Sequence, residues 1–324
     1  MAAANMLTRN FYIPLSRMVH KVWAVLFPAG YAKYYYKKAY GKSLNLKDPK
    51  DFNEKVQWLK VYSDTTQWTE LADKYKVREY LKELGLQDIL VKLYGVWENS
   101  NEIDFDKLPE KFVLKTNHGF SQNILVHDKS NLDFEETKAK LNKWVNEKYG
   151  LKSFQPHYWK IPGKIIAEEL LQNFSSAHIS SSLIDYKFWC IHGEPDIIMV
   201  VYDRKHTRSQ SEKNNKKHPF RASIYDLDWN LRKDIISGPL SKEKQLHLPK
   251  PKMFDEMIRI CKILSKPFVQ VRVDLYEVNG KIYFGELTFT PGAGLDYFTP
   301  EYFLKMGEKM DLSKARRRKK RFVF

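Results

Sequence analysis

Two acidic residues near the C-terminal end of the sequence are spaced so that a hairpin could bring them together. Residues 271–294 read VRVDLYEVNGKIYFGELTFTPGAG, in which Asn279-Gly280 is a strong signal for a tight turn between two strands. Asp274 lies on the first strand, two residues after Arg272, and Glu286 lies on the second. Paired carboxylates are ligands for Mg²⁺ and its bound phosphates. An arginine can stabilise the negative charge that builds up in phosphoryl transfer. The hairpin therefore predicts a magnesium site.

The register of this hairpin decides whether the two acids can share a ligand. Side chains alternate between faces along a strand. A two-residue turn at Asn279-Gly280 would set Asp274 opposite Gly285 and place Glu286 on the wrong face. A three-residue loop, or an extra bulge, brings Glu286 back to the face of Asp274. The magnesium prediction therefore requires an odd-length loop or a bulge, and an ordinary hairpin with surface charges is the alternative.

A lysine and a polar loop form a second group of candidate residues. Lys115 ends the predicted strand KFVLK and is followed by TNHGFSQN. A lysine beside a loop rich in hydrogen-bond donors suits a nucleoside triphosphate. The Walker A spacing is absent, so the loop alone is more typical of a surface turn. A single loop histidine, His118, is more typical of a hydrogen-bonding residue than of a catalytic base or metal ligand.

Three further charged residues lie in predicted strands. Glu168 and Glu169 are consecutive in IIAEELL, so one of the two is expected to face a ligand. Lys187, flanked by aromatic residues in DYKFWC, could reach a phosphate with its stem buried. Each is also compatible with an ordinary strand position. No GxSxG, GxGxxG or HExxH motif is present, so the sequence indicates neither a nucleophilic triad nor a zinc protease.

The order of the predicted elements indicates an α+β protein with largely antiparallel strands. Helices are expected after the Asp51 cap, over 69–84, over 133–149 and over 252–265. A second hairpin is expected to turn at His192-Gly193, and 204–219 to form a surface loop. The expected divisions are a basic aromatic segment (1–50), a mainly helical region (51–107), two α+β subdomains (108–200 and 201–310) and a basic tail (311–324).

Composition favours a globular protein of a reducing compartment. The chain has 324 residues, 43% apolar and 14% aromatic, which is enough for two or three subdomains. Its two cysteines, Cys190 and Cys261, are far apart and lack metal-ligand spacing. No secretory signal is evident, and the apolar run 22–27 is too short to span a bilayer. We therefore expect a cytoplasmic protein.

The net charge of +16 is concentrated at the two ends of the chain. The run KARRRKKR at 314–321 carries seven positive charges, and residues 9–42 add basic residues among aromatic ones. Such ends attract anionic lipid or an acidic polysaccharide, which predicts contact with the inner face of the membrane. A solubilising tail is the plainer alternative. Nucleic acid is not expected, because no nucleic-acid-binding motif accompanies the charge.

These segments, in this order, resemble the TupA-like family of the ATP-grasp superfamily. The resemblance covers roughly residues 50–307 and rests on long runs at consistent spacing. They are KVQWLKVY, ELADKYKVREYL, DFDKLPEKFVLKTNHG, IIAEELL, DYKFWCIHGEP, IYDLDWN and the hairpin 271–294. The resemblance implies an ATP-grasp fold, in which two α+β subdomains clasp ATP.

The resemblance also implies a role for each candidate residue. Arg272 and Lys115 are the implied catalytic residues, and Lys115 also contacts the α-phosphate of ATP. Asp274, Glu286 and Thr288 are the implied Mg²⁺ ligands. The implied nucleotide-binding residues are Lys115, Asn117, His118, Gly119, Ser121, Asn123, Glu168, Glu169, Leu171, Asp185, Lys187 and Arg221. The sequence departs from the superfamily at Thr288, where asparagine is usual, and in a loop whose one glycine is Gly119.

The activity that the resemblance implies is ATP-dependent ligation of a carboxylate to an amine through an acyl phosphate. The family's association with cell-envelope polymers implies an acidic sugar of a cell-surface polysaccharide as the carboxylate, and an amine or amino acid as its partner. The alternatives are a sugar kinase, a glycosyltransferase using the DLD string at 226–228, and a binding protein without turnover.

Overall fold

The computed structural model describes residues 19–20, 22–151, 153–172, 179–204, 220–238, 245–296 and 298–318. Three expected segments lie partly outside these residues: the N-terminal segment up to 18, the surface loop from 205 to 219, and the basic tail from 319. Short 3-10 helices connect the larger elements: η1 (Gln87–Ile89), η2 (Ser100–Glu102), η3 (Phe105–Lys107), η4 (Lys129–Asn131), η5 (Tyr158–Lys160), η7 (Pro291–Ala293) and η8 (Leu312–Lys314).

The first part of the chain is mainly helical, as expected. It contains α2 (Pro28–Tyr40), α3 (Phe52–Tyr62), α4 (Thr66–Leu71) and α5 (Val77–Glu83). The Glu54 N–H donates to the Asp51 side chain at 2.8 Å, which confirms the cap of α3. The single helix expected over 69–84 is wrong. Asp73 accepts the N–H of Tyr75 at 2.9 Å, and this local turn separates α4 from α5.

The smaller sheet is antiparallel and has the strand order β1 (Leu93–Trp97), β4 (Ile165–Glu169), β2 (Phe112–Thr116), β3 (Asn123–Val126). Helix α6 (Phe134–Val145) packs on it, with Leu141 buried in the same core as Phe112. The Asp133 side chain caps α6 by accepting the Glu136 N–H at 2.9 Å, as expected. The helix ends at Val145, before the expected end at Tyr149.

The larger sheet is also antiparallel, with the order β7 (Arg221–Tyr225), β6 (Glu194–Tyr202), β5 (Asp185–Ile191), β8 (Gln270–Val278), β9 (Lys281–Thr288). The hairpin β5–β6 turns at His192-Gly193, as expected, with φ of 49° and 88°. Helix α8 (Phe254–Ser265) packs against β5, β6 and β8 on one face. The other face of the sheet carries the charged residues considered below.

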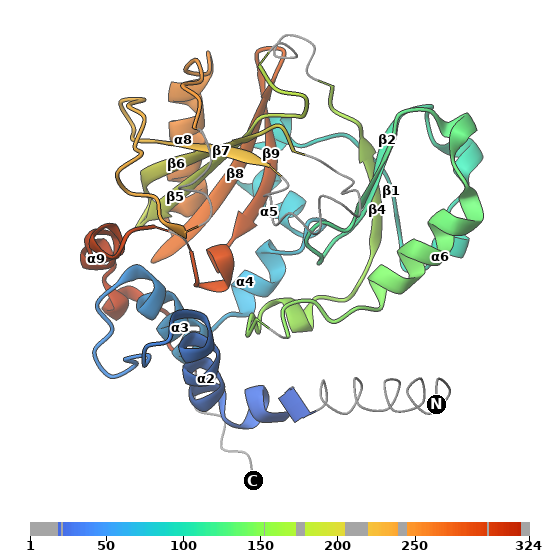
Figure 1. Cartoon of the computed structure of the whole chain (residues 1–324). Helices are drawn as coiled ribbons and strands as arrows, with labels where there is room; N and C mark the ends of the chain where they lie inside the picture. Colours follow the sequence, from blue (N-terminus) through green and yellow to red (C-terminus); the bar gives the residue numbers. More distant parts are fainter. Residues whose placement is uncertain are drawn as a thin grey trace, which may run out of the picture.

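The two sheets form two lobes, with α4 and α5 drawn between them in Figure 1. The expected subdomain boundaries do not coincide with the sheets. Strand β1 joins the smaller sheet although it lies before residue 108, and β5 begins the larger sheet well before residue 201. The mixed helices and antiparallel strands confirm the α+β class.

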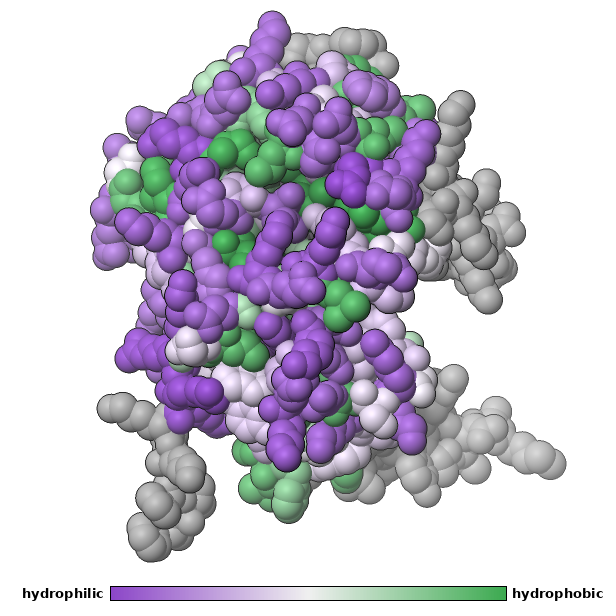
Figure 2. Space-filling view, turned by 90° about the vertical axis from the view of Figure 1, so that its left-hand side faces the viewer, coloured by the Kyte–Doolittle hydropathy of each residue, from purple (hydrophilic) through white to green (hydrophobic). Residues whose placement is uncertain are grey.

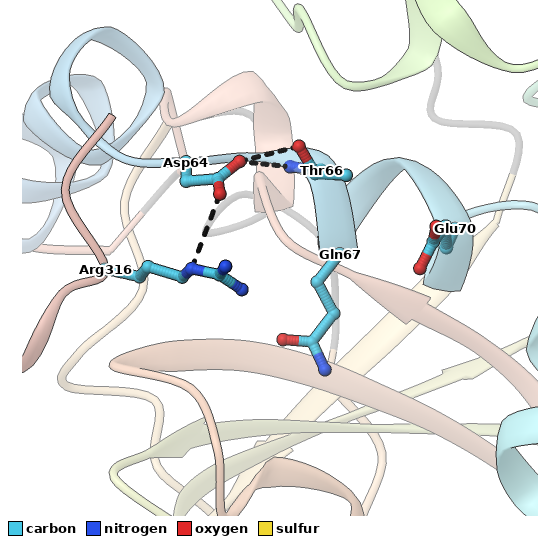
Figure 3. Close-up of a pocket in the computed structure, with 5 residues that line it drawn as sticks. All are labelled: Asp64, Thr66, Gln67, Glu70 and Arg316. Atoms are coloured by element: carbon cyan, nitrogen blue, oxygen red, sulfur yellow. Dashed lines mark hydrogen bonds and ion pairs between the residues drawn. The ribbon is translucent and has the colours of Figure 1, made fainter. Parts of the chain in front are cut away.

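The chain returns to the N-terminal helices after α9 (Pro300–Lys309). Arg317 forms a backbone bridge with Ser63, and its guanidinium lies 4.3 Å from the centre of the Trp58 ring. Arg316 Nε lies 3.4 Å from Asp64 Oδ2 beside α4, as Figure 3 shows. The start of the basic tail is therefore docked on the turn between α3 and α4.

Candidate active site

The hairpin β8–β9 brings the two acids together by a bulge. Its turn has two residues, Asn279 and Gly280, with φ of 53° and 78°, so the three-residue loop considered from the sequence is wrong. The register then shifts between Asp274 and Leu275, so that Asp274 pairs with Glu286. The extra residue in β9 is Gly285. The bulge alternative is the one that the structure adopts.

Glycine at position 285 is explained by the closeness of the partner strand. A Cβ built there would lie 3.0 Å from the backbone oxygen of Asp274 and 3.1 Å from the Tyr276 ring. These contacts are tighter than a side-chain carbon normally makes. Gly285 therefore permits the bulge that puts both acids on one face.

Asp274 is the most buried acid of the site, with 1% of its side chain exposed. Arg272 donates to both of its carboxylate oxygens, each at 2.7 Å. Lys187, directly opposite on β5, donates to Oδ2. Burial raises the pKa of the Asp274 carboxyl, but the attraction of Arg272 and Lys187 outweighs it and holds the pKa below its usual value. Asp274 is therefore a carboxylate.

Glu286, on β9, shares Arg272 with Asp274 and has Lys74 as its second cation. Its Oε1 lies 3.5 Å from Arg272 Nη2, and its Oε2 lies 3.6 Å from Lys74 Nζ. Burial raises the pKa of Glu286, and Lys74 leads the opposing effects that leave it lowered overall. The Thr288 hydroxyl accepts from Arg272 at 3.1 Å and donates to Glu286 at 3.3 Å. The three expected metal-binding residues are thus brought together.

The donor set suits Mg²⁺ better than a metal that needs a cage of protein ligands. In the part of the chain that the structure describes, no group of three or more His, Cys, Asp and Glu side chains is arranged to hold a metal. Mg²⁺ in nucleotide sites is bound by one or two carboxylates, with waters and phosphate oxygens as its other ligands. Asp274 and Glu286 fit that requirement, with the Thr288 hydroxyl beside them.

Asp185 extends the charged face towards the start of β5. Its Oδ2 lies 2.6 Å from Lys187 Nζ and 3.2 Å from Arg204 Nη2. Its Oδ1 is buried and has no hydrogen-bond partner among the described residues. Burial raises the pKa of Asp185, against the attraction of Lys187. A buried acceptor without a donor is where a ligand hydroxyl could bind.

The smaller sheet contributes a second charged group. Lys115 Nζ lies 2.5 Å from Glu168 Oε2, and Arg78 Nη1 lies 3.4 Å from Glu168 Oε1. Glu169, the next residue, points to the other face of β4, so one of the two acids meets Lys115, as the alternation predicts. Leu171 lies beyond the end of β4.

The loop after β2 divides into a buried and an exposed half. Asn117 is buried, and its side chain bonds the backbone of Pro162 and Lys164 at 3.0 and 2.7 Å. The His118 ring nitrogens lie 3.1 Å from Asn117 Oδ1 and 2.9 Å from the Glu147 carbonyl, and burial lowers the pKa of the imidazole. Both side chains are engaged in holding the loop, so the structure does not aim them at a ligand. Ser121 and Asn123 are exposed.

Gly119 lies at the boundary of the two halves. A Cβ there would lie 1.8 Å from Gln122 Oε1, whose side chain is held by Thr116 at 2.5 Å and Glu147 at 2.9 Å. The Gly119 carbonyl accepts a hydrogen bond from Lys74 Nζ at 2.9 Å. The loop is therefore held by the hydrogen bonds of Gln122 to Thr116 and Glu147, and by the hydrogen bond from Lys74 to Gly119.

Lys74 is a site residue that the sequence reasoning missed. Its one ammonium group contacts both Gly119 on the loop of the smaller sheet and Glu286 on the larger sheet. On the continuous helix expected over 69–84, Lys74 would have been one more surface lysine. The signal that could have found it is Asp73, a residue that favours turns over helix interiors.

Arg221 is not brought to the other candidates. It pairs with Tyr202 across β6 and β7, and its guanidinium lies 5.4 Å from the centre of the Tyr202 ring. Lys187 pairs with Met199 on β6, so these two side chains share one face of the sheet. Tyr202 is three residues after Met199 and therefore points to the opposite face, and its partner Arg221 points there too. Among the described residues, Arg221 Nη1 lies 3.5 Å from Asp203 Oδ2. The expected phosphate contact is therefore not supported.

Comparison with known proteins identifies the fold family. The family model described as TupA-like ATPgrasp matches residues 54–311. Among solved structures, the chain resembles D-alanine–D-alanine ligase from Bacillus anthracis (14% identity, 78% of this chain and 71% of that one, TM-score 0.46). It also resembles the same enzyme from Helicobacter pylori (13% identity, 81% and 67%, TM-score 0.41).

No curated protein gives a significant match. At these identities and TM-scores the solved structures carry no argument about activity, and the assignment rests on the family model, which covers most of the chain. It confirms the resemblance found in the sequence. The chain belongs to the TupA-like ATP-grasp family.

Proposed function

We propose that this protein is an ATP-dependent carboxylate–amine ligase. In the proposed reaction, a substrate carboxylate takes the γ-phosphoryl group of ATP, giving ADP and an acyl phosphate. An amine then displaces phosphate and loses a proton, which forms an amide. The observation that carries the proposal is the position of Lys74, which contacts the loop after β2 and Glu286 on β9. It supports a single site between the charged faces of the two sheets.

The residues can supply positioning and charge, which are the main needs of phosphoryl transfer. In this proposal Lys115 holds the α-phosphate, while the exposed half of the loop after β2, with Ser121, and Asn123 at the start of β3 cover the β- and γ-phosphates. Lys74 adds a cation beside them. Arg272 stabilises the negative charge of the acyl phosphate and of the tetrahedral intermediate that follows it. No side chain is required as a covalent nucleophile.

The remaining nucleotide contacts follow from β4 and β5. The backbone of β4 and the residues after it, up to Leu171, would bind adenine, with Glu168 near the adenine amino group. Oδ1 of Asp185, which has no hydrogen-bond partner in the described part of the chain, would accept from a ribose hydroxyl. Lys187 contacts both Asp185 and Asp274, and from there it would bind a phosphate oxygen of ATP.

Asp274 and Glu286 would hold Mg²⁺, with Thr288 as a weaker neighbour. When bound, the ion supplies positive charge to the phosphate oxygens. Asp274 is satisfied here by Arg272 and Lys187. Those two cations are therefore available to turn towards phosphate once the carboxylate has a metal to bind.

We further propose that the carboxylate belongs to an acidic sugar of a cell-surface polysaccharide, and that the amine is an amino acid or another primary amine. The support is the net charge of +16 and its concentration at the chain ends, which suit an anionic substrate near the inner face of the membrane. A structural role for Asp226 counts against the glycosyltransferase alternative. Asp226 Oδ1 caps its own turn by accepting the N–H of Asp228 at 3.1 Å and of Asn230 at 2.8 Å.

The test is turnover of labelled ATP with a uronic-acid oligosaccharide, with and without added amino acids. Hydroxylamine is included to trap an acyl phosphate as a hydroxamate. Hydroxamate formation and amine-dependent ADP release support the ligase. A stable phosphorylated sugar identifies a kinase instead. Binding of Mg·ATP without turnover for any of these probes points to a binding protein.

A further inference from the structure

An apolar ridge lies on the outside of the first described residues, before α2. It consists of Val19, Val22, Val25, Leu26 and Phe27, whose exposed fractions run from 46 to 64%. In Figure 2 hydrophobic side chains gather at the lower edge, the end of the molecule where this segment lies in Figure 1. Single exposed apolar residues are ordinary, but a contiguous group marks a binding surface.

The ridge is held outward by the other side of the same segment. Ala24 is 2% exposed, and Trp23 packs edge-on against the buried Tyr31, with ring centres 5.2 Å apart. His20 also packs on Tyr31, at 5.7 Å. The segment is thus anchored to α2 through its inner residues, and the ridge is left facing out.

The surroundings of the ridge are entirely basic in sequence. No Asp or Glu occurs before Asp48, and Lys33, Lys37 and Lys38 of α2 are exposed. Lys33 and Lys37 also line a surface pocket of about 300 Å³ with Tyr34. A second copy of the chain would bring the same uncompensated charge against this face. Charge complementarity therefore favours an anionic occupant.

The docked C-terminal segment adds charge at the same end of the molecule. Arg318 N–H donates to the Tyr62 carbonyl at 2.9 Å, next to the bridge between Ser63 and Arg317. Arg316 keeps 80% of its side chain exposed.

We infer that the apolar ridge inserts into the headgroup region of an anionic lipid surface, while the lysines of α2 and the docked arginines bind its phosphates. An apolar face flanked by Lys and Arg is the arrangement that lies in a membrane interface. Among the described residues, no helix combines the length and the hydropathy that a bilayer span requires. The inference rests on the proposed function, in which the substrate lies near the membrane. It concerns binding of the protein to lipid and not the reaction itself.

The test is sedimentation of the full chain with vesicles of phosphatidylcholine alone, and with vesicles of phosphatidylcholine and phosphatidylglycerol in equal parts. Binding is expected to the mixed vesicles and to weaken as salt is raised. The double variant Leu26→Asp, Phe27→Asp is expected to lower the partition coefficient about tenfold or more. Leu304→Asp is the matched control, since Leu304 is 45% exposed on α9.

Several results would overturn the inference. One is equal binding of the double variant and the wild type. Another is equal binding to both kinds of vesicle, or none to either. A third is a concentration-dependent dimer, seen by ultracentrifugation, that the double variant abolishes. ATP turnover with a soluble oligosaccharide is measured in parallel, so that loss of lipid binding with intact turnover separates this inference from the proposed reaction.

Discussion

Lys74 Nζ lies 3.6 Å from Glu286 Oε2 and, at the same time, 2.9 Å from the carbonyl oxygen of Gly119. The side chain comes from the turn between α4 and α5, outside both sheets. One ammonium group therefore links a metal-ligand candidate on β9 to the loop after β2. The proposed phosphate position lies next to all three groups.

Replacing Lys74 tests this link directly. Lys74→Met is expected to lower kcat/KM for ATP by about a hundredfold, the usual effect of removing one group that stabilises transition-state charge. Lys76→Met is the matched control, because Lys76 is an exposed lysine of the same turn. Steady-state kinetics at saturating Mg²⁺ measures both. Similar losses of kcat/KM in the two variants would show that Lys74 does not act on the phosphates.

Removing the carboxylates is expected to weaken Mg²⁺ binding without abolishing the fold. Glu286→Gln should raise the half-saturating Mg²⁺ concentration about tenfold, since one of two carboxylate ligands is lost. Asp274→Asn should do so more strongly, but it also leaves two buried cations with a poorer partner. Glu277→Gln is the control, because Glu277 lies on β8, the strand of Asp274. Calorimetric titration of Mg·ATP that is identical for Glu286→Gln and wild type would rule out this hairpin as the metal site.

The two glycines of the hairpin should separate stability from function. Gly285→Ala pushes a Cβ against the Asp274 backbone at 3.0 Å, so it should shift the bulge and reduce Mg·ATP affinity about tenfold. Gly280→Ala meets nothing within 4 Å but must keep φ near 78°, so it should cost about 1 kcal/mol of stability. Denaturant unfolding and nucleotide titration of both variants check this. The reverse pattern would contradict the role given to the bulge.

Asp296 should make stability depend on pH in a specific direction. Burial raises the pKa of its carboxyl to about 6, against the attraction of Arg272 and the hydrogen bond from Trp189 Nε1 at 3.2 Å. Because the folded state favours the protonated acid, stability should fall as pH rises from about 4 to about 6 and stay lowered above that. Asp296→Asn keeps the acceptor for Trp189 and removes the charge.

The Asn variant should therefore melt a few degrees above the wild type at pH 8, with no comparable gain at pH 4.5. Asp255→Asn, at a side chain that is 99% exposed, serves as the control. Thermal unfolding followed by circular dichroism measures the difference. A gain of equal size at both pH values would show that Asp296 is not the titrating group.

Local signals in the sequence predicted much of the fold. Asp51 and Asp133 cap helices where expected, because a cap depends on a side chain and a backbone three residues away. Asn279-Gly280 predicted the β8–β9 turn because a two-residue hairpin turn depends on the conformational preferences of its own two residues. The break at Asp73 was missed because the apolar spacing on both sides of it continues as one helical pattern.

Long-range placement was less accessible to sequence reasoning. The bulge at Gly285 could be stated only as a requirement, since a strand pattern does not say on which side of the pair an extra residue lies. Arg221 has a suitable charge but lies on the face of the sheet opposite Lys187. This can be seen only once its pairing with Tyr202 is known. Lys74 acts through two contacts that are distant in sequence, with Gly119 and Glu286, and no local pattern encodes such a pair.

The ion pairs of the site have a consequence for the order in which ligands arrive. Six cations of the described residues are paired with four carboxylates: Lys74, Arg78, Lys115, Lys187, Arg204 and Arg272 with Glu168, Asp185, Asp274 and Glu286. Asp296, which Arg272 also attracts, is a fifth acid, so the positive charges of this group still exceed the negative ones. Bare Mg²⁺ is repelled by such a surplus, whereas Mg·ATP carries about two net negative charges and neutralises it. The metal should therefore enter already bound to its nucleotide.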